Sequence, residues 1–367
     1  MSQQDRPLAH ARVALLYGPG NMAADYASAL VRGIERGLLE LGADVATLNL
    51  AFFKRHMRSG SLIFDDESPY VRGIKRFLND TAGARGFDYC LGMFYDQYLT
   101  VGLQECLRQH CRVVINYPLN LLDQPTFFEK ALQFCDITFC SEEGALASLR
   151  ARHGDRRVRY VPMAADPFIH RPIARPERPR LLFVGSLYAD RPLLLERCAD
   201  IIDLSIYGPR YDAVKVLGTF AREFAHRRRL NGIGYAARAL ARAARRDSRI
   251  VSDEEFVRLA SEHGVSIGFS SVRQEHTKKV LYKVRLRDYE STMCGLCHLA
   301  KRLPELERGF VESEEILFYD TDNEILEILG RVRKGEIDWA GIGKRARARA
   351  ERDHTWTRRL RGAFSQE

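Results

Sequence analysis

Short apolar runs alternate with amphipathic stretches along the first half of the chain. Residues 12–20 form an apolar run that ends in Gly-Pro-Gly, and residues 43–50 form a second run. Between them, over residues 22–41, apolar side chains recur at helical spacing. This order of strand, helix and strand is the repeating unit of a parallel sheet. The same pattern predicts further strands over 87–94, 111–118, 137–141 and 158–164, and helices over 124–135 and 142–152.

The alternation resumes after a proline-rich segment over residues 171–180. Strands are predicted over 181–188, 203–209, 264–271, 295–301 and 314–320, with helices over 253–263, 287–294 and 322–333. We therefore expect an α/β protein with two Rossmann-like domains, at 1–170 and 180–345, and a C-terminal helix over 346–367. Ligands of such parallel sheets bind at the carboxyl ends of the strands, so two facing sheets predict a site in an interdomain cleft.

The distribution of charge interrupts this pattern once. The chain has a net charge of +9, and residues 211–251 are rich in arginine. We interpret this segment as a basic helical insertion in the second domain. Such a segment can bind nucleic acid through phosphates or dock on an anionic membrane surface. Aromatic residues for base stacking are sparse in it, which favours a membrane surface or a lipid-linked acceptor over nucleic acid.

Cysteine usage and hydropathy indicate the cellular compartment. The eight cysteines lie mostly in apolar runs, and the N-terminal residues lack the apolar core of a signal peptide. No apolar stretch approaches the roughly 20 residues that span a bilayer. A cytoplasmic protein is expected, with peripheral attachment to the inner membrane as an option. Cys294 and Cys297 form a CxxC pair, but no second pair follows at zinc spacing, so no metal site is expected.

Charged residues gather at the start of the helix expected near residue 287. Arg285, Arg287, Asp288 and Glu290 lie in or next to its first turn. A helix N-terminus and guanidinium groups together suit a diphosphate, and a carboxylate there can accept hydrogen bonds from a ribose diol. The alternative is an ordinary charged helix start, because helix starts favour such residues in general.

An ordered set of motifs surrounds this cluster. Arg287-Asp288-Tyr289-Glu290 is followed by Gly295, Pro304-Glu305-Leu306, Phe310, Glu315-Ile316 and Asp353-His354-Thr355-Trp356. Residues 283–356 thereby resemble the C-terminal domain of CgeB-like glycosyltransferases, which are similar to the retaining nucleotide-sugar enzymes of GT-B architecture. The resemblance implies a GT-B fold, a nucleotide-sugar as co-substrate, no cofactor and no metal.

A weaker resemblance extends upstream. Phe183-Val184-Gly185-Ser186, followed by Arg191, is similar to the first strand and loop of that domain, and Ile206-Tyr207-Gly208-Pro209 is similar to the second. The donor-binding residues implied by the resemblance are Gly185, Ser186, Arg191, Tyr207, Gly208, Arg285, Arg287, Glu290 and Gly295.

One position departs from the family. Retaining enzymes often carry a glutamate eight residues before the one matched by Glu290, and here that position is Tyr282. The sugar and the stereochemistry of transfer therefore stay open. A retaining enzyme can use the leaving phosphate to guide the acceptor, whereas an inverting enzyme needs a general base. Asp96, after an expected strand end, is the candidate base, with helix capping as the alternative.

The expected function is a glycosyltransferase of the hexosyltransferase type. It would move a sugar from a nucleotide-sugar to a glycan, lipid-linked or protein acceptor, as in polysaccharide biosynthesis. A catalytically inactive nucleotide-sugar-binding or nucleic-acid-binding protein, and an epimerase that acts on the donor, are the alternatives. His298 is expected to be a hydrogen-bonded core histidine, and His354 to brace the last helix.

Overall fold

The computed structural model describes residues 6–17, 24–50, 64–122, 124–186, 191–208, 251–274, 277 and 279–365. The chain divides into two compact units. The first unit comprises Met1–Asp166, Ser270–Leu286 and Asp353–Glu367, and the second comprises Pro167–Phe269 and Arg287–Arg352. The first boundary lies close to the expected one, but two later segments of the chain return to the first unit.

The first unit contains a six-stranded sheet in the order β2-β1-β3-β4-β5-β6, with every pair of neighbours parallel. Its strands are β1 (Arg12–Tyr17), β2 (Asp44–Asn49), β3 (Phe87–Gly92), β4 (Cys111–Asn116), β5 (Ile137–Cys140) and β6 (Val158–Tyr160). Five of the six residues of β1 are fully buried, as expected for a central strand covered on both faces. The apolar runs of the sequence are thus confirmed as strands of a parallel sheet.

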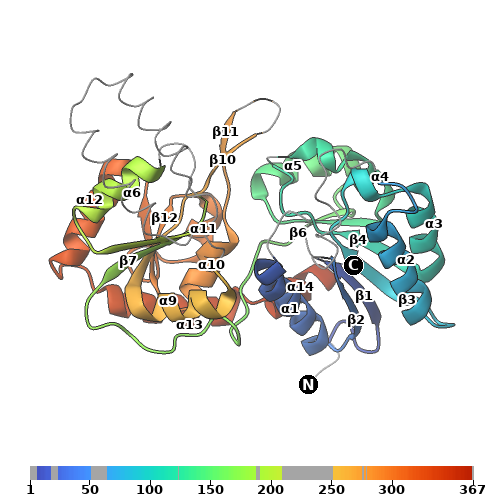
Figure 1. Ribbon diagram of the computed structural model, residues 1–367, viewed down its shortest axis with the longest axis horizontal. Helices are drawn as coiled ribbons and strands as arrows, with labels where there is room; N and C mark the ends of the chain where they lie inside the picture. Colours follow the sequence, from blue (N-terminus) through green and yellow to red (C-terminus); the bar gives the residue numbers. More distant parts are fainter. Residues whose placement is uncertain are drawn as a thin grey trace. The chain divides into compact units, whose positions relative to one another are not determined.

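Helices cover this sheet (Figure 1). They are α1 (Ala24–Glu40), α2 (Pro69–Thr81), α3 (Val101–His110), α4 (Glu129–Phe134), α5 (Glu143–His153) and α14 (Trp356–Phe364), with short 3-10 turns η3 (Asp96–Tyr98) and η4 (Pro125–Phe127). α14 packs on α1 because Gly33 and Gly37, one turn apart, leave room for Trp356 and Leu360. A Cβ on Gly33 would lie 2.4 Å from the Trp356 ring.

The C-terminal segment forms two helices where one was expected. α13 (Trp339–Asp353) ends before His354, and Thr355 then caps α14, its side chain accepting a hydrogen bond from the Arg358 N–H. Between the two helices the His354 carbonyl does not continue the helical hydrogen bonding. It accepts a hydrogen bond from the Ala165 N–H instead. The Arg359 guanidinium lies 2.8 Å from Nδ1 of His354. His354 therefore braces the start of the last helix, as expected.

The second unit contains a five-stranded parallel sheet in the order β13-β12-β9-β7-β8. Its strands are β7 (Arg180–Val184), β8 (Leu204–Tyr207), β9 (Gly264–Ile267), β12 (Cys297–Lys301) and β13 (Leu317–Tyr319). Its helices are α6 (Arg191–Ala199), α9 (Asp253–His263), α10 (Leu286–Met293), α11 (Pro304–Gly309), α12 (Asp322–Arg333) and α13. Two Rossmann-like sheets are therefore present, as the sequence predicts.

A hairpin interrupts the second half of the chain. The strand expected over 264–271 ends at Ile267, and β10 (Ser271–Arg273) pairs antiparallel with β11 (Val280–Tyr282). The segment that carries the hairpin is fastened to the first unit by Lys283. The buried Lys283 ammonium donates to the Leu119 carbonyl, to Asn120 and to the Glu142 carboxylate. This anchor explains why residues 270–286 belong to the first unit although the flanking elements belong to the second.

Some expectations fall on residues outside the described ranges, namely most of the basic insertion 211–251 and the Gly-Pro-Gly loop 18–20. All eight cysteines are free and buried. Burial raises the pKa of the Cys294 and Cys297 thiols, which keeps both protonated near neutral pH. Among the described helices, none combines the length and the hydropathy that a membrane span requires.

Candidate functional site

Two glycines meet where strands β7 and β8 of the second unit end. Val184 and Tyr207 are register partners at the carboxyl ends of the two strands. The Gly185 N–H donates to the Tyr207 carbonyl at 2.9 Å. Gly208 has φ of 145°, and a Cβ there would lie 2.1 Å from the Gly185 carbonyl oxygen. Only glycine fits at position 208. At Gly185 and Gly208 no side chain therefore covers the backbone, and both residues lie at the sheet edge where ligands of parallel sheets bind.

Arg191 connects two loops of the same edge. It opens α6, and its guanidinium donates to the Ser186 carbonyl at 3.1 Å and to the Phe269 carbonyl at 3.3 Å. It also stacks over the Phe269 ring, 5.2 Å from the centroid. Gly185, Ser186, Arg191, Tyr207 and Gly208 are therefore brought together as the sequence predicts. A largely buried guanidinium at this edge favours an anionic ligand.

Helix α10 begins near the same edge. Asp288, in its first turn, lies against the residues that follow β9, since a Cβ on Gly268 would lie 2.5 Å from Asp288 Oδ1. His298 Nε2 lies 2.9 Å from that carboxylate oxygen, and His298 Nδ1 lies 2.8 Å from Ser266 Oγ. All three side chains are buried. His298 is thus a hydrogen-bonded core histidine, as predicted, and this chain fixes the start of α10 on the sheet.

Arg287, which is partly exposed, and the buried Glu290 form an ion pair on another face of α10. Arg287 Nη1 lies 3.0 Å from Glu290 Oε2. The Arg287 guanidinium also lies over the Phe256 ring of α9, 4.0 Å from the centroid. The side chain of Glu290 is 2% exposed and that of Arg287 is 16% exposed. Of the two side chains, only that of Arg287 therefore reaches solvent to an appreciable extent.

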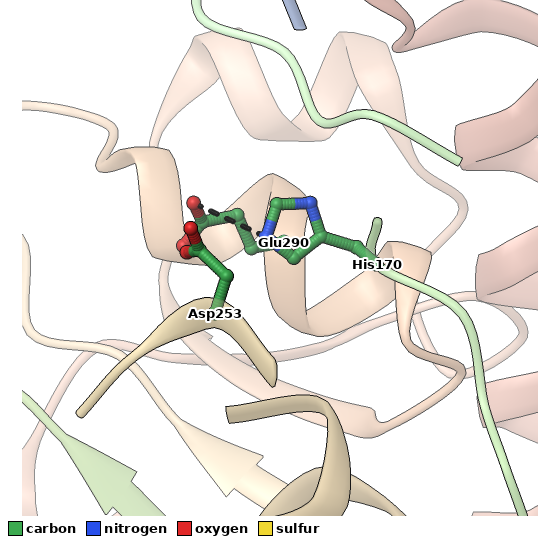
Figure 2. Close-up of side chains that lie close together, drawn as sticks. All are labelled: His170, Asp253 and Glu290. Carbon is green, nitrogen blue, oxygen red and sulfur yellow. Dashed lines mark ion pairs between the residues drawn. The ribbon is translucent and has the colours of Figure 1, made fainter. Parts of the chain in front are cut away.

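Two residues that the sequence analysis missed complete this cluster. His170 lies in the irregular segment after Asp166, and Asp253 is the first residue of α9. Figure 2 shows the His170 ring and the carboxylates of Asp253 and Glu290 turned toward one another. His170 Nε2 lies 3.5 Å from Glu290 Oε1, and one ligand atom from each of the three lies within 4.8 Å of the others. All three side chains are buried.

The sequence offered little signal for these two residues. His170 is followed by a proline-rich linker and lies in no periodic pattern, and Asp253 reads as an ordinary acidic residue at a helix start. A histidine and two carboxylates are donor groups that a divalent cation accepts. Here, however, Arg287 already supplies a positive charge to Glu290.

Two more residues of the predicted set are Arg285, which belongs to the first unit, and Gly295, which belongs to the second. The Arg285 guanidinium donates to the Ser271 carbonyl of the hairpin at 2.9 Å. Gly295 lies at the far end of α10, where its φ of 75° makes the turn into β12. A Cβ on Gly343 of α13 would lie 2.1 Å from the Gly295 carbonyl oxygen. Because α10 begins at the carboxyl edge of the sheet and Gly295 follows its last turn, Gly295 is not brought to the two glycine loops.

Asp96, the candidate base, belongs to the first unit. It opens η3, four residues after the end of β3, and is half-buried. Its Oδ1 accepts a hydrogen bond from the Ala131 N–H at 2.9 Å, in the first turn of α4. The carboxylate therefore caps α4 and not its own turn. A capping bond leaves other acceptor positions of the carboxylate open, so a catalytic role for Asp96 stays a prediction.

Comparison with known proteins identifies the fold. Residues 191–364 match a protein-family model described as glycosyl transferase-like. The solved structures that resemble the whole chain include sucrose-phosphate synthase from Thermosynechococcus elongatus, with 13% identity, 96% of this chain and 98% of that chain covered, and a TM-score of 0.56. Anabaena HepE in complex with UDP and glucose has 10% identity, coverage of 98% and 100%, and a TM-score of 0.57.

A glycosyltransferase from Rickettsia africae has 10% identity, coverage of 97% of both chains and a TM-score of 0.59. No curated protein matches the sequence significantly. The chain, which contains two parallel sheets, thus has the GT-B fold, and the family match covers Arg191, Tyr207, Gly208, Arg287 and Glu290.

Proposed function

We propose that this glycosyltransferase of GT-B fold transfers a hexose from a nucleoside-diphosphate sugar to a glycan, lipid-linked or protein acceptor. The observation that carries the proposal is the meeting of Gly185, Gly208 and Arg191 at the carboxyl edge of the second sheet. Bare backbone next to a guanidinium suits a diphosphate. One structural neighbour, Anabaena HepE, was solved with UDP-glucose, which makes uridine diphosphate sugars the first donors to test.

The residues of the second unit have distinct proposed roles. The loops at Gly185-Ser186 and Gly208 admit the diphosphate, with Arg191 and Arg287 offsetting its charge. Glu290 would accept hydrogen bonds from the ribose, since a carboxylate has about four acceptor positions. Arginines that stabilise the charge developing on the leaving diphosphate make a metal ion unnecessary. We therefore propose a metal-independent transfer.

Thermal unfolding with candidate donors tests the proposal. A ligand at 100 times its Kd stabilises the folded state by about 2.7 kcal/mol, so UDP-glucose should raise Tm by about 2 °C or more. EDTA should leave that shift unchanged. GDP-, TDP- and CMP-sugars define the base preference, and ADP controls for binding by charge alone. If no nucleotide-sugar shifts Tm while the protein is folded, the proposal is wrong.

The stereochemistry of the product separates the two mechanisms. A retaining transfer, which we favour from the resemblance to retaining enzymes, needs no base from the protein. Inversion would require one, and Asp96 is then the candidate. Determining the anomer of the transferred sugar by NMR decides between them, and inversion would contradict the retaining proposal.

The basic segment 211–251 is the proposed contact with an anionic membrane surface that carries the acceptor. Lysine and arginine near such a surface contribute about 1 kcal/mol each at low salt. Deleting residues 220–248 should therefore reduce cosedimentation with phosphatidylglycerol vesicles while the thermal shift with UDP-glucose remains. Equal vesicle binding with and without the segment would refute the membrane contact.

A further inference from the structure

The β9 loop, Gly268 and Phe269, follows strand β9 at the edge of the second sheet where β7 and β8 also end. The Gly268 N–H donates to the Leu299 carbonyl of β12 at 2.8 Å, which extends the contact between β9 and β12 by one residue. The Tyr319 hydroxyl of β13 donates to the Gly268 carbonyl at 2.7 Å. The backbone of Gly268 is therefore bonded to the two strands on one side of β9.

The space around Gly268 is also filled. A Cβ at this position would lie 2.5 Å from Asp288 Oδ1 of α10 and 2.9 Å from His298 Nε2 of β12. Both of these side chains are buried, and they are 2.9 Å apart. Gly268 is thus bonded through its backbone and enclosed by buried side chains, so its position can change only if one of these contacts is lost.

Phe269 connects the β9 loop to the residues of the candidate donor site. Its carbonyl accepts a hydrogen bond from the Arg191 guanidinium at 3.3 Å, and its ring lies under the same guanidinium, 5.2 Å from the centroid. The ring also packs against the Phe183 ring, at 5.3 Å between centroids. Phe183 in turn lies next to the first glycine loop, since a Cβ on Gly185 would be 3.1 Å from Phe183 Cζ. Phe269 therefore contacts the guanidinium directly and the Gly185 loop through one other ring.

The Tyr319 hydroxyl is suited to hold the β9 loop. Its side chain is buried in the apolar core of the second unit, and Phe269 packs against the same core. Burial raises the pKa of Tyr319, and the nearby Asp288 carboxylate raises it further. The hydroxyl is therefore protonated at neutral pH and donates to the Gly268 carbonyl.

We propose that Tyr319 is a positioning residue of the donor site. Its hydroxyl holds the β9 loop, and the β9 loop orients the Arg191 guanidinium beside the Gly185 loop. The inference rests on the proposed function, because that function assigns Arg191 and Gly185 to the diphosphate. Tyr319 acts through the loop and not by contact with the donor. An arginine that is already oriented loses less side-chain freedom when the diphosphate binds, so the positioning contributes to affinity.

A coupled pair of substitutions tests this role. Tyr319→Phe removes the hydroxyl and keeps the ring, and isothermal titration should then give an affinity for UDP about fivefold weaker, which corresponds to about 1 kcal/mol. Arg191→Lys keeps the positive charge but lacks the planar fork of the guanidinium. In that background Tyr319→Phe should weaken UDP binding by less than about twofold, because both substitutions act on the same guanidinium. A purely structural role for Tyr319 predicts a lower Tm and an unchanged affinity.

Tyr17→Phe is the matched control. Tyr17 is a buried tyrosine of the first unit, and its hydroxyl donates to the Tyr117 carbonyl at 2.9 Å. Tyr17→Phe should lower Tm and leave the UDP affinity unchanged. The inference is overturned if Tyr319→Phe binds UDP as the wild type does, if it weakens binding equally with Arg191 and with lysine at that position, or if Tyr17→Phe weakens binding as much. Failure of the folded wild type to bind any nucleotide would instead overturn the proposed function.

Discussion

Gly208→Ala should abolish nucleotide binding and destabilise the second unit by about 3 kcal/mol. The φ of Gly208 is 145°, which a residue with a side chain rarely adopts, and the added Cβ would lie 2.1 Å from the Gly185 carbonyl oxygen. That carbonyl belongs to backbone, so relief of the overlap requires the ends of β7 and β8 to separate. Urea unfolding and titration with UDP measure the two effects.

Gly330→Ala provides the control for this substitution. Gly330 lies in α12, and a Cβ there would meet nothing within 4 Å. Alanine should therefore stabilise the helix by about 0.5–1 kcal/mol and leave UDP binding unchanged. A Gly208→Ala protein that binds UDP with wild-type affinity would contradict the placement of the donor at this edge.

Arg287→Met should lower both stability and donor affinity. The carboxylate of Glu290 is buried, and the loss of the guanidinium beside it should lower the free energy of unfolding by about 3 kcal/mol. Methionine keeps much of the contact with Phe256, so the loss reports the charge. The affinity for UDP should fall about 100-fold, because a guanidinium facing a diphosphate contributes several kcal/mol.

Arg258→Met is the matched control on the neighbouring helix. Arg258 forms exposed ion pairs with Glu255 and Glu262 on α9, and such pairs contribute about 0–1 kcal/mol. Arg258→Met should therefore change neither the free energy of unfolding nor the free energy of UDP binding by more than about 1 kcal/mol. If Arg287→Met retained full UDP affinity, Arg287 would be a structural residue only.

The strands of both sheets could be predicted from the sequence because a central parallel strand is apolar on both faces. Shorter or half-exposed elements carry less signal. α2 buries only Tyr70, Val71, Ile74 and Leu78 beneath a charged surface, and no helix was predicted there. The hairpin of β10 and β11 has three residues in each strand, too few for an alternation to stand out.

The candidate site was predictable where it is local in the sequence. Gly185 and Ser186 form one loop and Tyr207 and Gly208 form the next, and the topology of a parallel sheet places both at the same edge. His170 and Asp253 were not predictable, because their relation to Glu290 exists only after three separate segments have packed. Gly295 is the opposite case. It belongs to the motif that predicted the site, but it makes the turn after the last residues of α10, at the other end of that helix from Arg287.

The path of the chain limits how this protein can be divided. The boundary between the units is passed after Asp166, after Phe269, after Leu286 and after Arg352, and α14, the last described helix, packs on α1, the first. A fragment that stops at residue 170 would leave the groove at Gly33 and Gly37 empty and expose the apolar surface that Trp356 covers. Each half can therefore be produced by itself only with its distant segments joined to it, and a single cut in the linker is expected to be a poor starting point for domain exchange.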